Sequence, residues 1–170
     1  MNYSDIFKSS INNLKIEGKY RYFNEIERKV GNHPNAFWIS NSKKNDIIVW
    51  CSNDYLGMSQ NKLVINSMID SIQRMGIGSG GTRNISGNSS AIVHLENELA
   101  DLHSKEKAVI FSSGYVANES TISTLLNLLE DSVVFSDEKN HASIISGIKK
   151  SNALKEIFKH NDLNHLEALI

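Results

Sequence analysis

The sequence predicts an α/β fold in which helices cover a mostly parallel sheet. Three short runs rich in β-branched and aromatic residues are typical of core strands, at residues 108–111, 133–135 and 156–158. Longer segments with apolar residues at helical spacing follow the first two runs, at residues 115–129 and 141–150. Strands that alternate with helices in this way are typical of a parallel sheet.

The chain before residue 108 is less regular. Near the N-terminus, apolar residues at helical spacing predict a short amphipathic helix. These residues are Tyr3, Phe7, Ile11 and Leu14. We expect residues 1–45 to form an arm outside the main core, followed by a short strand at residues 47–50 and a turn-rich stretch at 52–57. Further helices are expected at residues 61–75 and through Leu95, Leu99 and Leu102.

The last predicted element is an amphipathic turn over residues 163–169, capped by Asp162. The chain stops on the apolar side of this helix without a glycine or a basic cap. Three core strands also make a small sheet for this architecture, so an apolar patch would stay exposed. The sequence therefore reads as a piece of a longer protein.

Composition argues against several classes of protein. The formal net charge is −1, with no block of like charges, so we do not expect a nucleic-acid partner. The N-terminus lacks the pattern of a signal or transit peptide, and no apolar run is long enough for a membrane span. We expect a cytoplasmic protein, or a mitochondrial matrix protein after removal of a leader.

The single cysteine, Cys51, indicates a reducing compartment and is expected to be a small buried side chain. The histidines show no metal-ligand spacing with a cysteine pair, so no metal is expected.

A glycine-rich loop follows the helix at 61–75. Gly76, Gly78 and Gly81 match G-x-G-x-x-G, but a dinucleotide fingerprint must follow a strand and open a helix. Here a helix precedes the glycines and a loop follows them, so a tightly folded loop is the simpler interpretation. Thr82, Arg83 and Asn84 come next, and their donors suit a carboxylate or a phosphate.

Two further segments stand where predicted strands end. The turn at Ser112–Tyr115 opens a helix, and a helix N-terminus with a glycine is either an anion site or an ordinary cap. The stretch from Ser136 to Ser143 contains His141, which could stack on an aromatic cofactor, move a proton or cap a surface helix. A Ser-His-Asp hydrolase is disfavoured because there is no G-x-S-x-G elbow.

Several motifs together resemble the α-oxoamine synthases, pyridoxal-phosphate enzymes that condense an amino acid with an acyl-CoA and release carbon dioxide. Residues 50–58 read WCSNDYLGM, which resembles a signature of this family. Residues 82–87 read TRNISG, and this form is similar to the 5-aminolevulinate synthases within the family. The same similarity is found at residues 20–28, 137–143 and 158–162. The resemblance therefore covers essentially the whole chain.

The resemblance implies a fold, a reaction and partners. The fold is an N-terminal arm and substrate-gripping segment (residues 1–45) plus an incomplete large parallel-sheet domain of a fold-type I transferase (residues 46–170). The reaction joins glycine to succinyl-CoA with pyridoxal 5'-phosphate as cofactor, and the product, 5-aminolevulinate, feeds tetrapyrrole and heme synthesis. A homodimer is implied as well.

The resemblance also implies roles for substrate-binding residues. Arg21 resembles the arginine that grips the free carboxylate of the succinyl group, and Thr82 and Asn84 look like its helpers. Asn53 resembles a contact to the glycine-derived part.

The remaining implied roles concern the cofactor and CoA. Gly114 and Tyr115 resemble donors to the cofactor phosphate, and His141 resembles the histidine stacked on its ring. Ser136 and Lys155 resemble contacts to the CoA portion.

The chain departs from the family in one respect: the Schiff-base lysine of these enzymes lies beyond the position of Ile170. The resemblance therefore implies that these 170 residues alone do not catalyse the condensation. Two alternatives stay open, namely an α-oxoamine synthase with another acyl-CoA and a non-catalytic partner subunit. The latter would bind CoA or phosphate through Arg21, Arg83, Lys155 and the Gly114 turn.

Overall fold

The computed structural model describes residues 2–170, and the chain divides into two compact units on either side of the Gly78–Ser79 bond. We call the part up to Gly78 the first unit and the part from Ser79 to Ile170 the second unit. The boundary predicted between residues 45 and 46 stays a prediction.

The first unit begins with α1 (Tyr3–Ile16), which confirms the predicted N-terminal helix. The helix starts there because the Asn2 side chain accepts the N–H of Ser4, one of the donors that the first turn leaves unpaired. No residue of α1 is buried, so its apolar stripe faces solvent in the described chain.

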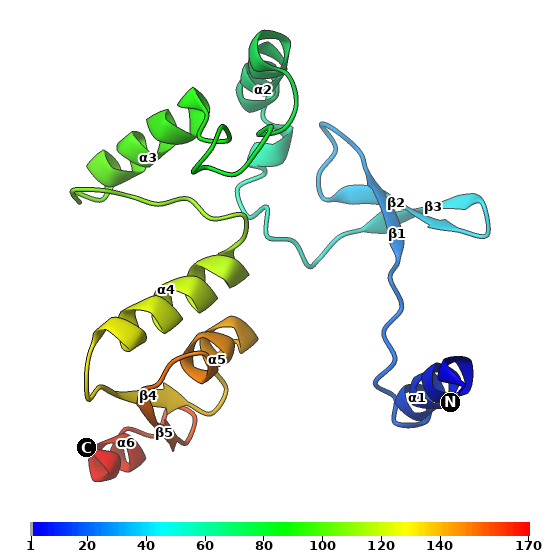
Figure 1. The fold of residues 1–170 in the computed structure, drawn as a ribbon. Helices are drawn as coiled ribbons and strands as arrows, with labels where there is room; N and C mark the ends of the chain where they lie inside the picture. Colours follow the sequence, from blue (N-terminus) through cyan, green and yellow to red (C-terminus); the bar gives the residue numbers. More distant parts are fainter. Residues whose placement is uncertain (1) are drawn as a thin grey trace. The chain divides into compact units, whose positions relative to one another are not determined.

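An antiparallel sheet of three strands follows, in the order β1 (Glu25–Arg28), β2 (Asn35–Ser40), β3 (Lys43–Ile48) (Figure 1). β2 and β3 are joined by a two-residue turn at Asn41 and Ser42, both with positive φ, as a type I′ hairpin requires. Only one strand was predicted here, at residues 47–50, and it overlaps the end of β3 at Ile48. β1 and β3 escaped prediction because they are mostly polar and exposed, and therefore lack an alternating apolar pattern.

The first unit ends with a short 3₁₀ turn, η1 (Met58–Gln60), and α2 (Lys62–Met75). Asn61 caps α2 by accepting the N–H of Leu63, and Gly76, with φ of 77°, ends it. This confirms the helix predicted at residues 61–75.

The second unit contains α3 (Ser90–Leu102), α4 (Gly114–Leu128), β4 (Val133–Asp137), α5 (Ala142–Lys149), β5 (Leu154–Phe158) and α6 (Leu163–Leu169). β4 and β5 pair in parallel and α5 connects them, which is the β-α-β arrangement that the alternating pattern predicts. Asp162 caps α6 by accepting the N–H of His165, as expected.

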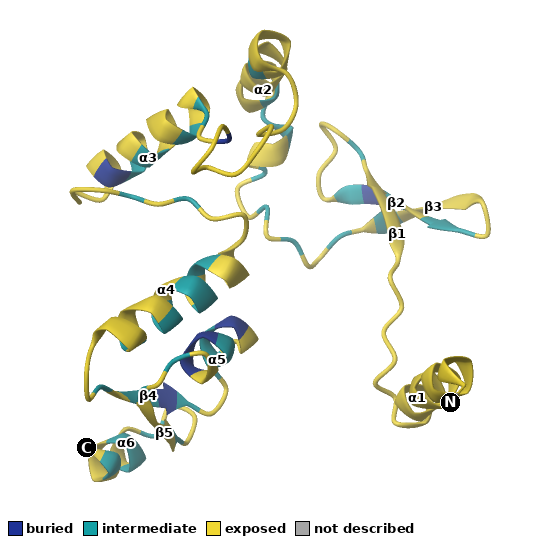
Figure 2. Cartoon of the chain, viewed as in Figure 1, coloured by how far each residue is buried: buried dark blue, intermediate teal, exposed yellow. Residues whose placement is uncertain are grey.

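In the second unit, buried residues gather on α5, which packs against α4 (Figure 2). Ile148 and Gly147 of α5 are buried, and a Cβ added to Gly147 would lie 2.9 Å from the Cβ of Ile122 on α4. Only glycine lets the two helices approach this closely. Ser143 on α5 and Ser136 on β4 are buried polar residues.

One predicted strand is wrong. Residues 108–111 have no regular secondary structure and form no ladder in the described chain, so β4 and β5 make a parallel sheet of two strands rather than three. A strand exists only where a neighbour pairs with its backbone. The N–H of Ile110 donates instead to the Oε1 atom of Glu96 on α3, 2.8 Å away.

None of the helices in residues 2–170 combines the length and apolar character that crossing a membrane demands.

Candidate functional site

The N-terminus of α4 is an open anion-binding turn. The Ser113 side chain accepts the N–H of Val116, which leaves the N–H groups of Gly114 and Tyr115 at helix positions that have no intrahelical acceptor. A Cβ added to Gly114 would meet no atom within 4 Å, so the space in front of these donors is clear. Two free N–H groups at a helix N-terminus favour a negatively charged oxygen.

His141 lies next to this turn because it is the N-cap of α5, which packs on α4. The rings of Tyr115 and His141 have centroids 6.2 Å apart and meet edge to face at 70°. The structure thus brings together all three residues to which the sequence assigned cofactor contacts, namely Gly114, Tyr115 and His141.

A hydrogen-bond chain through the buried Ser143 holds His141. Its Nδ1 atom accepts the backbone N–H of Ser143 at 3.2 Å and lies 2.7 Å from the Ser143 hydroxyl oxygen. That hydroxyl accepts the side-chain N–H of Asn118 on α4 at 3.0 Å. Ser143 and Asn118 were not singled out from the sequence, because only the packing of α4 on α5 joins positions 25 residues apart.

Ser136 and Lys155, the two residues implied to contact CoA, lie on the neighbouring strands β4 and β5. Both line a small cavity of about 140 Å³, together with Lys149 of α5. The Ser136 hydroxyl accepts an N–H from the Asn140 side chain at 2.9 Å. Asp137 and Glu138 line the same cavity, so its polar lining holds a hydroxyl, two ammonium groups and two carboxylates.

The carboxyl end of β4 is fastened to the segment after β5. Asp137 accepts the N–H of Lys139, and its other contacts are the N–H of Asn161 and the His160 ring. These hydrogen bonds, that of Lys139 first, lower the pKa of Asp137 below its ordinary value. The cluster therefore orders the loop between Asp137 and His141. Separately, no group of carboxylates, histidines and cysteines within residues 2–170 has a metal-binding arrangement.

Thr82 and Asn84 lie on a closed loop between α2 and α3. The Thr82 carbonyl accepts the N–H groups of Ile85, Ser86 and Gly87. A Cβ at Gly87 would lie 1.9 Å from the Gly81 carbonyl oxygen, so the loop can close only with glycine there. Thr82 and Asn84 share this loop and are exposed; no described contact joins them to Tyr115 or His141.

Arg83, between them, is engaged by its own chain. Its guanidinium donates to both oxygens of Glu96 at 2.6 and 2.8 Å, and to the Asn88 side chain. This pairing, with a second contribution from the N–H of Ile110, lowers the pKa of Glu96 to about 2. The expectation that Arg83 offers a free guanidinium to a carboxylate or phosphate is therefore wrong, because Glu96 occupies it.

Arg21 and Asn53 lie in the first unit, in segments without helix or strand, and both are exposed. Cys51 is also exposed, which contradicts the expected buried position, because the chain leaves the sheet after β3 and no other element covers the residue.

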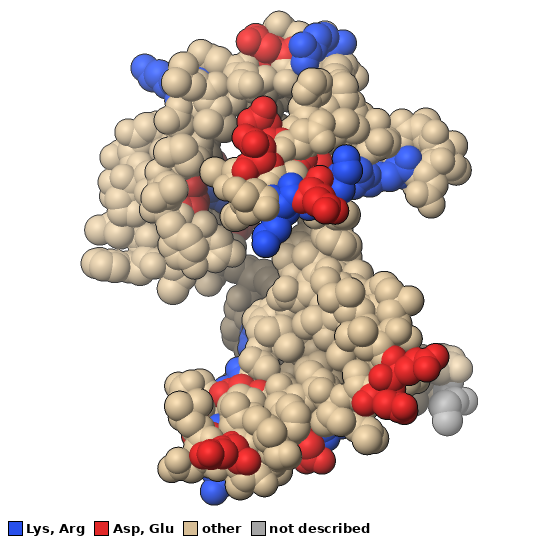
Figure 3. All heavy atoms as spheres, turned by 90° about the vertical axis from the view of Figure 1, so that its left-hand side faces the viewer, with Lys and Arg blue, Asp and Glu red and all other residues tan. Residues whose placement is uncertain are grey.

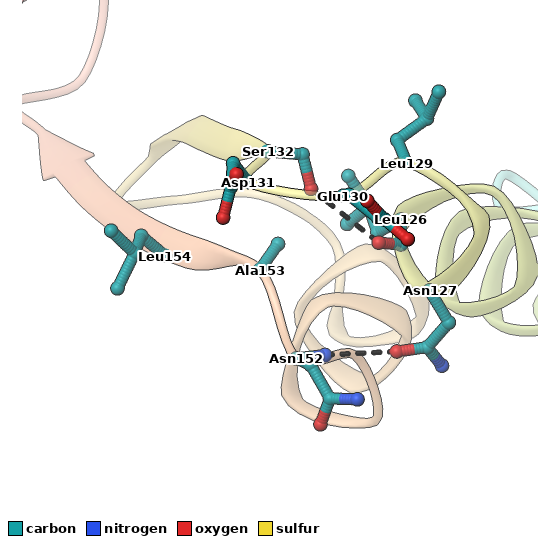
Figure 4. Close-up of a pocket in the computed structure, with 9 residues that line it drawn as sticks. All are labelled: Leu126, Asn127, Leu129, Glu130, Asp131, Ser132, Asn152, Ala153 and Leu154. Carbon is teal, nitrogen blue, oxygen red and sulfur yellow. Dashed lines mark hydrogen bonds between the residues drawn. The ribbon is translucent and has the colours of Figure 1, made fainter.

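Another cavity of the second unit lies away from these residues. It measures about 450 Å³, and nine residues line it (Figure 4): Leu126, Asn127, Leu129, Glu130, Asp131, Ser132, Asn152, Ala153 and Leu154. Two hydrogen bonds drawn there, Asn152 N–H to Asn127 and Ser132 hydroxyl to the Leu126 carbonyl, tie the end of α4 to the starts of β4 and β5. Since ligands of parallel sheets bind at the carboxyl ends of strands, we assign it no function. The face drawn in Figure 3 carries charges of both signs without a broad basic surface.

Comparison with known proteins identifies the family of the chain. Residues 45–170 match the family model described as aminotransferase class I and II. The chain is 48% identical over 170 residues to the 5-aminolevulinate synthase of Bradyrhizobium diazoefficiens, covering all of this chain and 42% of that protein. It is 49% identical over 168 residues to that of Rickettsia prowazekii, covering 99% of this chain and 40% of that protein. The chain thus spans about two fifths of the length of these relatives.

Solved structures show the same fold. The serine palmitoyltransferase of Sphingomonas wittichii matches with a TM-score of 0.78 and 25% identity, over 98% of this chain and 40% of that one. That of S. paucimobilis, solved with PLP and myriocin bound, matches with a TM-score of 0.76 and 28% identity, over 97% and 41%. The α/β fold, as part of a fold-type I pyridoxal-phosphate enzyme, is thereby confirmed. The chain belongs to the family of class I and II aminotransferases, within which it is a homologue of the 5-aminolevulinate synthases.

Proposed function

We propose that this chain forms part of the active site of a 5-aminolevulinate synthase, which condenses glycine with succinyl-CoA. The observation that carries the proposal is the identity of 48% to such a synthase along all 170 residues. Serine palmitoyltransferases align over nearly the same length at only 25–28% identity, which favours glycine and succinyl-CoA over serine and a long acyl chain.

The residues present fit pyridoxal 5'-phosphate. The free N–H groups of Gly114 and Tyr115 face open space that a phosphate could fill, and the His141 ring stands beside Tyr115. When bound, this cofactor supplies an electron sink that eases loss of a proton from the α-carbon of an amino acid. In this proposal the α4 turn holds the phosphate and His141 lies against the ring.

The acyl-CoA would be held at two places. Lys155 and Ser136 line one small cavity, and in our proposal they contact the phosphates of CoA. Arg21, Thr82 and Asn84 would bind the far carboxylate of the succinyl group, since selection of a dicarboxylic acyl chain needs a cation and neutral donors at that end. Because Glu96 neutralises Arg83, that arginine does not compete for the carboxylate.

The lysine that anchors the cofactor belongs, in this proposal, to the part of the relatives outside the matched two fifths. We also propose a homodimer, as the resemblance to the 5-aminolevulinate synthases implies. The alternative of a phosphate-binding partner without chemistry is less favoured, because Arg83, one of its four proposed contacts, pairs with Glu96.

The test uses the protein at its full natural length with glycine, pyridoxal phosphate and a series of acyl-CoAs. We expect 5-aminolevulinate and free CoA from succinyl-CoA and little turnover of palmitoyl-CoA. In Arg21→Leu, kcat/KM for succinyl-CoA should fall about tenfold or more, as for a lost hydrogen bond to a charged group. The KM for glycine should stay unchanged.

Arg74→Leu is the matched control, because Arg74 lies in the last turn of α2 and is exposed. Equal loss of succinyl-CoA selectivity in both variants would contradict the role of Arg21. Absence of 5-aminolevulinate with every acyl-CoA would contradict the proposed function itself.

A further inference from the structure

Two groups of Ser143 approach the Nδ1 atom of His141, namely its backbone N–H and its hydroxyl. The backbone N–H can only donate, and its bond to Nδ1, at 3.2 Å, lies at the long end of the usual range. This bond alone favours a neutral ring with its proton on Nε2 but leaves the hydroxyl to decide the balance.

The hydroxyl of Ser143 reinforces this arrangement. The Asn118 side chain donates an N–H to that hydroxyl, which leaves the hydroxyl's own hydrogen for His141 Nδ1, 2.7 Å away. Ser143 is fully buried, so water does not offer its hydroxyl another partner. All donors in the chain from Asn118 through Ser143 point the same way, toward Nδ1.

We propose that Asn118 and Ser143 are positioning residues that hold His141 in the neutral tautomer with its proton on Nε2. The ring then presents an N–H donor on its far edge, suited to an anionic or carbonyl oxygen of a bound amino acid or cofactor. The proposal rests on the proposed function for its catalytic meaning, whereas the tautomer is a property of the protein alone.

The decisive variant is Asn118→Asp, which keeps the size of the side chain and reverses the chain of donors. A carboxylate only accepts, so it takes the hydrogen of the Ser143 hydroxyl and turns an oxygen lone pair toward His141. That lone pair favours a proton on Nδ1.

The matched control is Asn127→Asp on the same helix. Asn127 accepts the N–H of Asn152 at 2.9 Å through its side-chain oxygen, and an aspartate retains that bond. The variant loses only the long bond, at 3.4 Å, from the Asn127 side-chain N–H to the Lys150 carbonyl. The control therefore adds the same charge to α4 without touching His141.

The measurement is the long-range nitrogen–proton correlation spectrum of the full-length protein labelled with heavy-nitrogen histidine, before and after cofactor addition. His141→Gln identifies the His141 signals by their loss. We expect the Nε2–H pattern in the unsubstituted protein and in Asn127→Asp, and a shift toward Nδ1–H in Asn118→Asp. We also expect kcat/KM in Asn118→Asp to fall roughly tenfold or more, the scale of a lost hydrogen bond to a charged group.

A proton on Nδ1 in the unsubstituted protein, or an unchanged pattern in Asn118→Asp, would overturn the proposal. The spectrum of the unsubstituted protein tests the tautomer even if Asn118→Asp does not fold. If the unsubstituted protein gave the expected spectrum but had no synthase activity, the proposed function would be contradicted and the tautomer assignment would still hold.

Discussion

The two units of this chain hold their candidate site residues in different ways. In the second unit, the turn at Gly114 and the ring of His141 are fixed by helix capping and by buried contacts between α4 and α5. In the first unit, Arg21 and Asn53 are exposed and lie outside helices and strands. The second unit therefore holds these candidate residues in place before any ligand binds, whereas no helix or strand of the described chain contains Arg21 or Asn53.

The largest difference between the units should appear when apolar side chains are truncated. Ile148 on α5 is 5% exposed, whereas Ile16 on α1 is 83% exposed. Ile148→Ala should lower the free energy of unfolding of the second unit by about 2–5 kcal/mol, since it removes buried methyl groups and leaves a cavity. Chemical denaturation, followed by a signal from each unit, would measure the free energy of unfolding.

Ile16→Ala is the control and should change stability by less than about 0.5 kcal/mol, as for most surface positions. Similar losses in both variants would mean that α1 is covered in the natural protein, and the contrast between the units would then fail.

A smaller effect is expected where the two helices approach. In Gly147→Ala the new Cβ meets the Ile122 side chain at 2.9 Å and the Glu119 carbonyl at 3.0 Å. Overpacking costs about 1–3 kcal/mol and better helix propensity returns about 1. We expect a net loss of up to about 2 kcal/mol and faster amide hydrogen exchange in α4 and α5.

The same substitution at Gly114 is the control, because no atom lies within 4 Å of its added Cβ. Gly114→Ala should leave stability unchanged and weaken cofactor binding only. A destabilised Gly114→Ala would show that the space in front of α4 is already filled.

The smallest effect concerns the pairing of Arg83 with Glu96, and it depends on pH. The pKa of Glu96 falls from its ordinary value of 4.5 to about 2, chiefly through the Arg83 hydrogen bonds. A carboxyl group with a lowered pKa in the folded state stabilises the protein fully above pH 4.5 and loses this contribution as the pH falls toward about 2. Glu96→Gln should therefore be less stable at neutral pH, and the difference should shrink across that window.

Thermal unfolding at several pH values would test this, with Glu98→Gln on the same helix as control, since Arg83 does not contact Glu98. A pH-independent difference would mean that shape rather than charge at position 96 holds the loop.

Many helices were predictable from local patterns. In the second unit, the helices at 115–129 and 141–150 and the cap at Asp162 were expected within a residue or two of their observed bounds, as was the helix at 61–75 in the first unit. Apolar periodicity and capping residues act within one element, so the sequence alone displays them. The turn at Gly114 and the position of His141 at the end of β4 follow from the same signals.

Other features depended on contacts between distant residues. Whether residues 108–111 form a strand depends on a neighbour, and which partner Arg83 takes depends on α3 lying beside its loop. The chain from Asn118 through Ser143 to His141 likewise exists only because Gly147 lets α5 pack closely on α4. The sequence by itself determined the elements and the motif residues. Their pairing was decided by the tertiary structure, because hydrogen bonds and close packing join positions that no local pattern links.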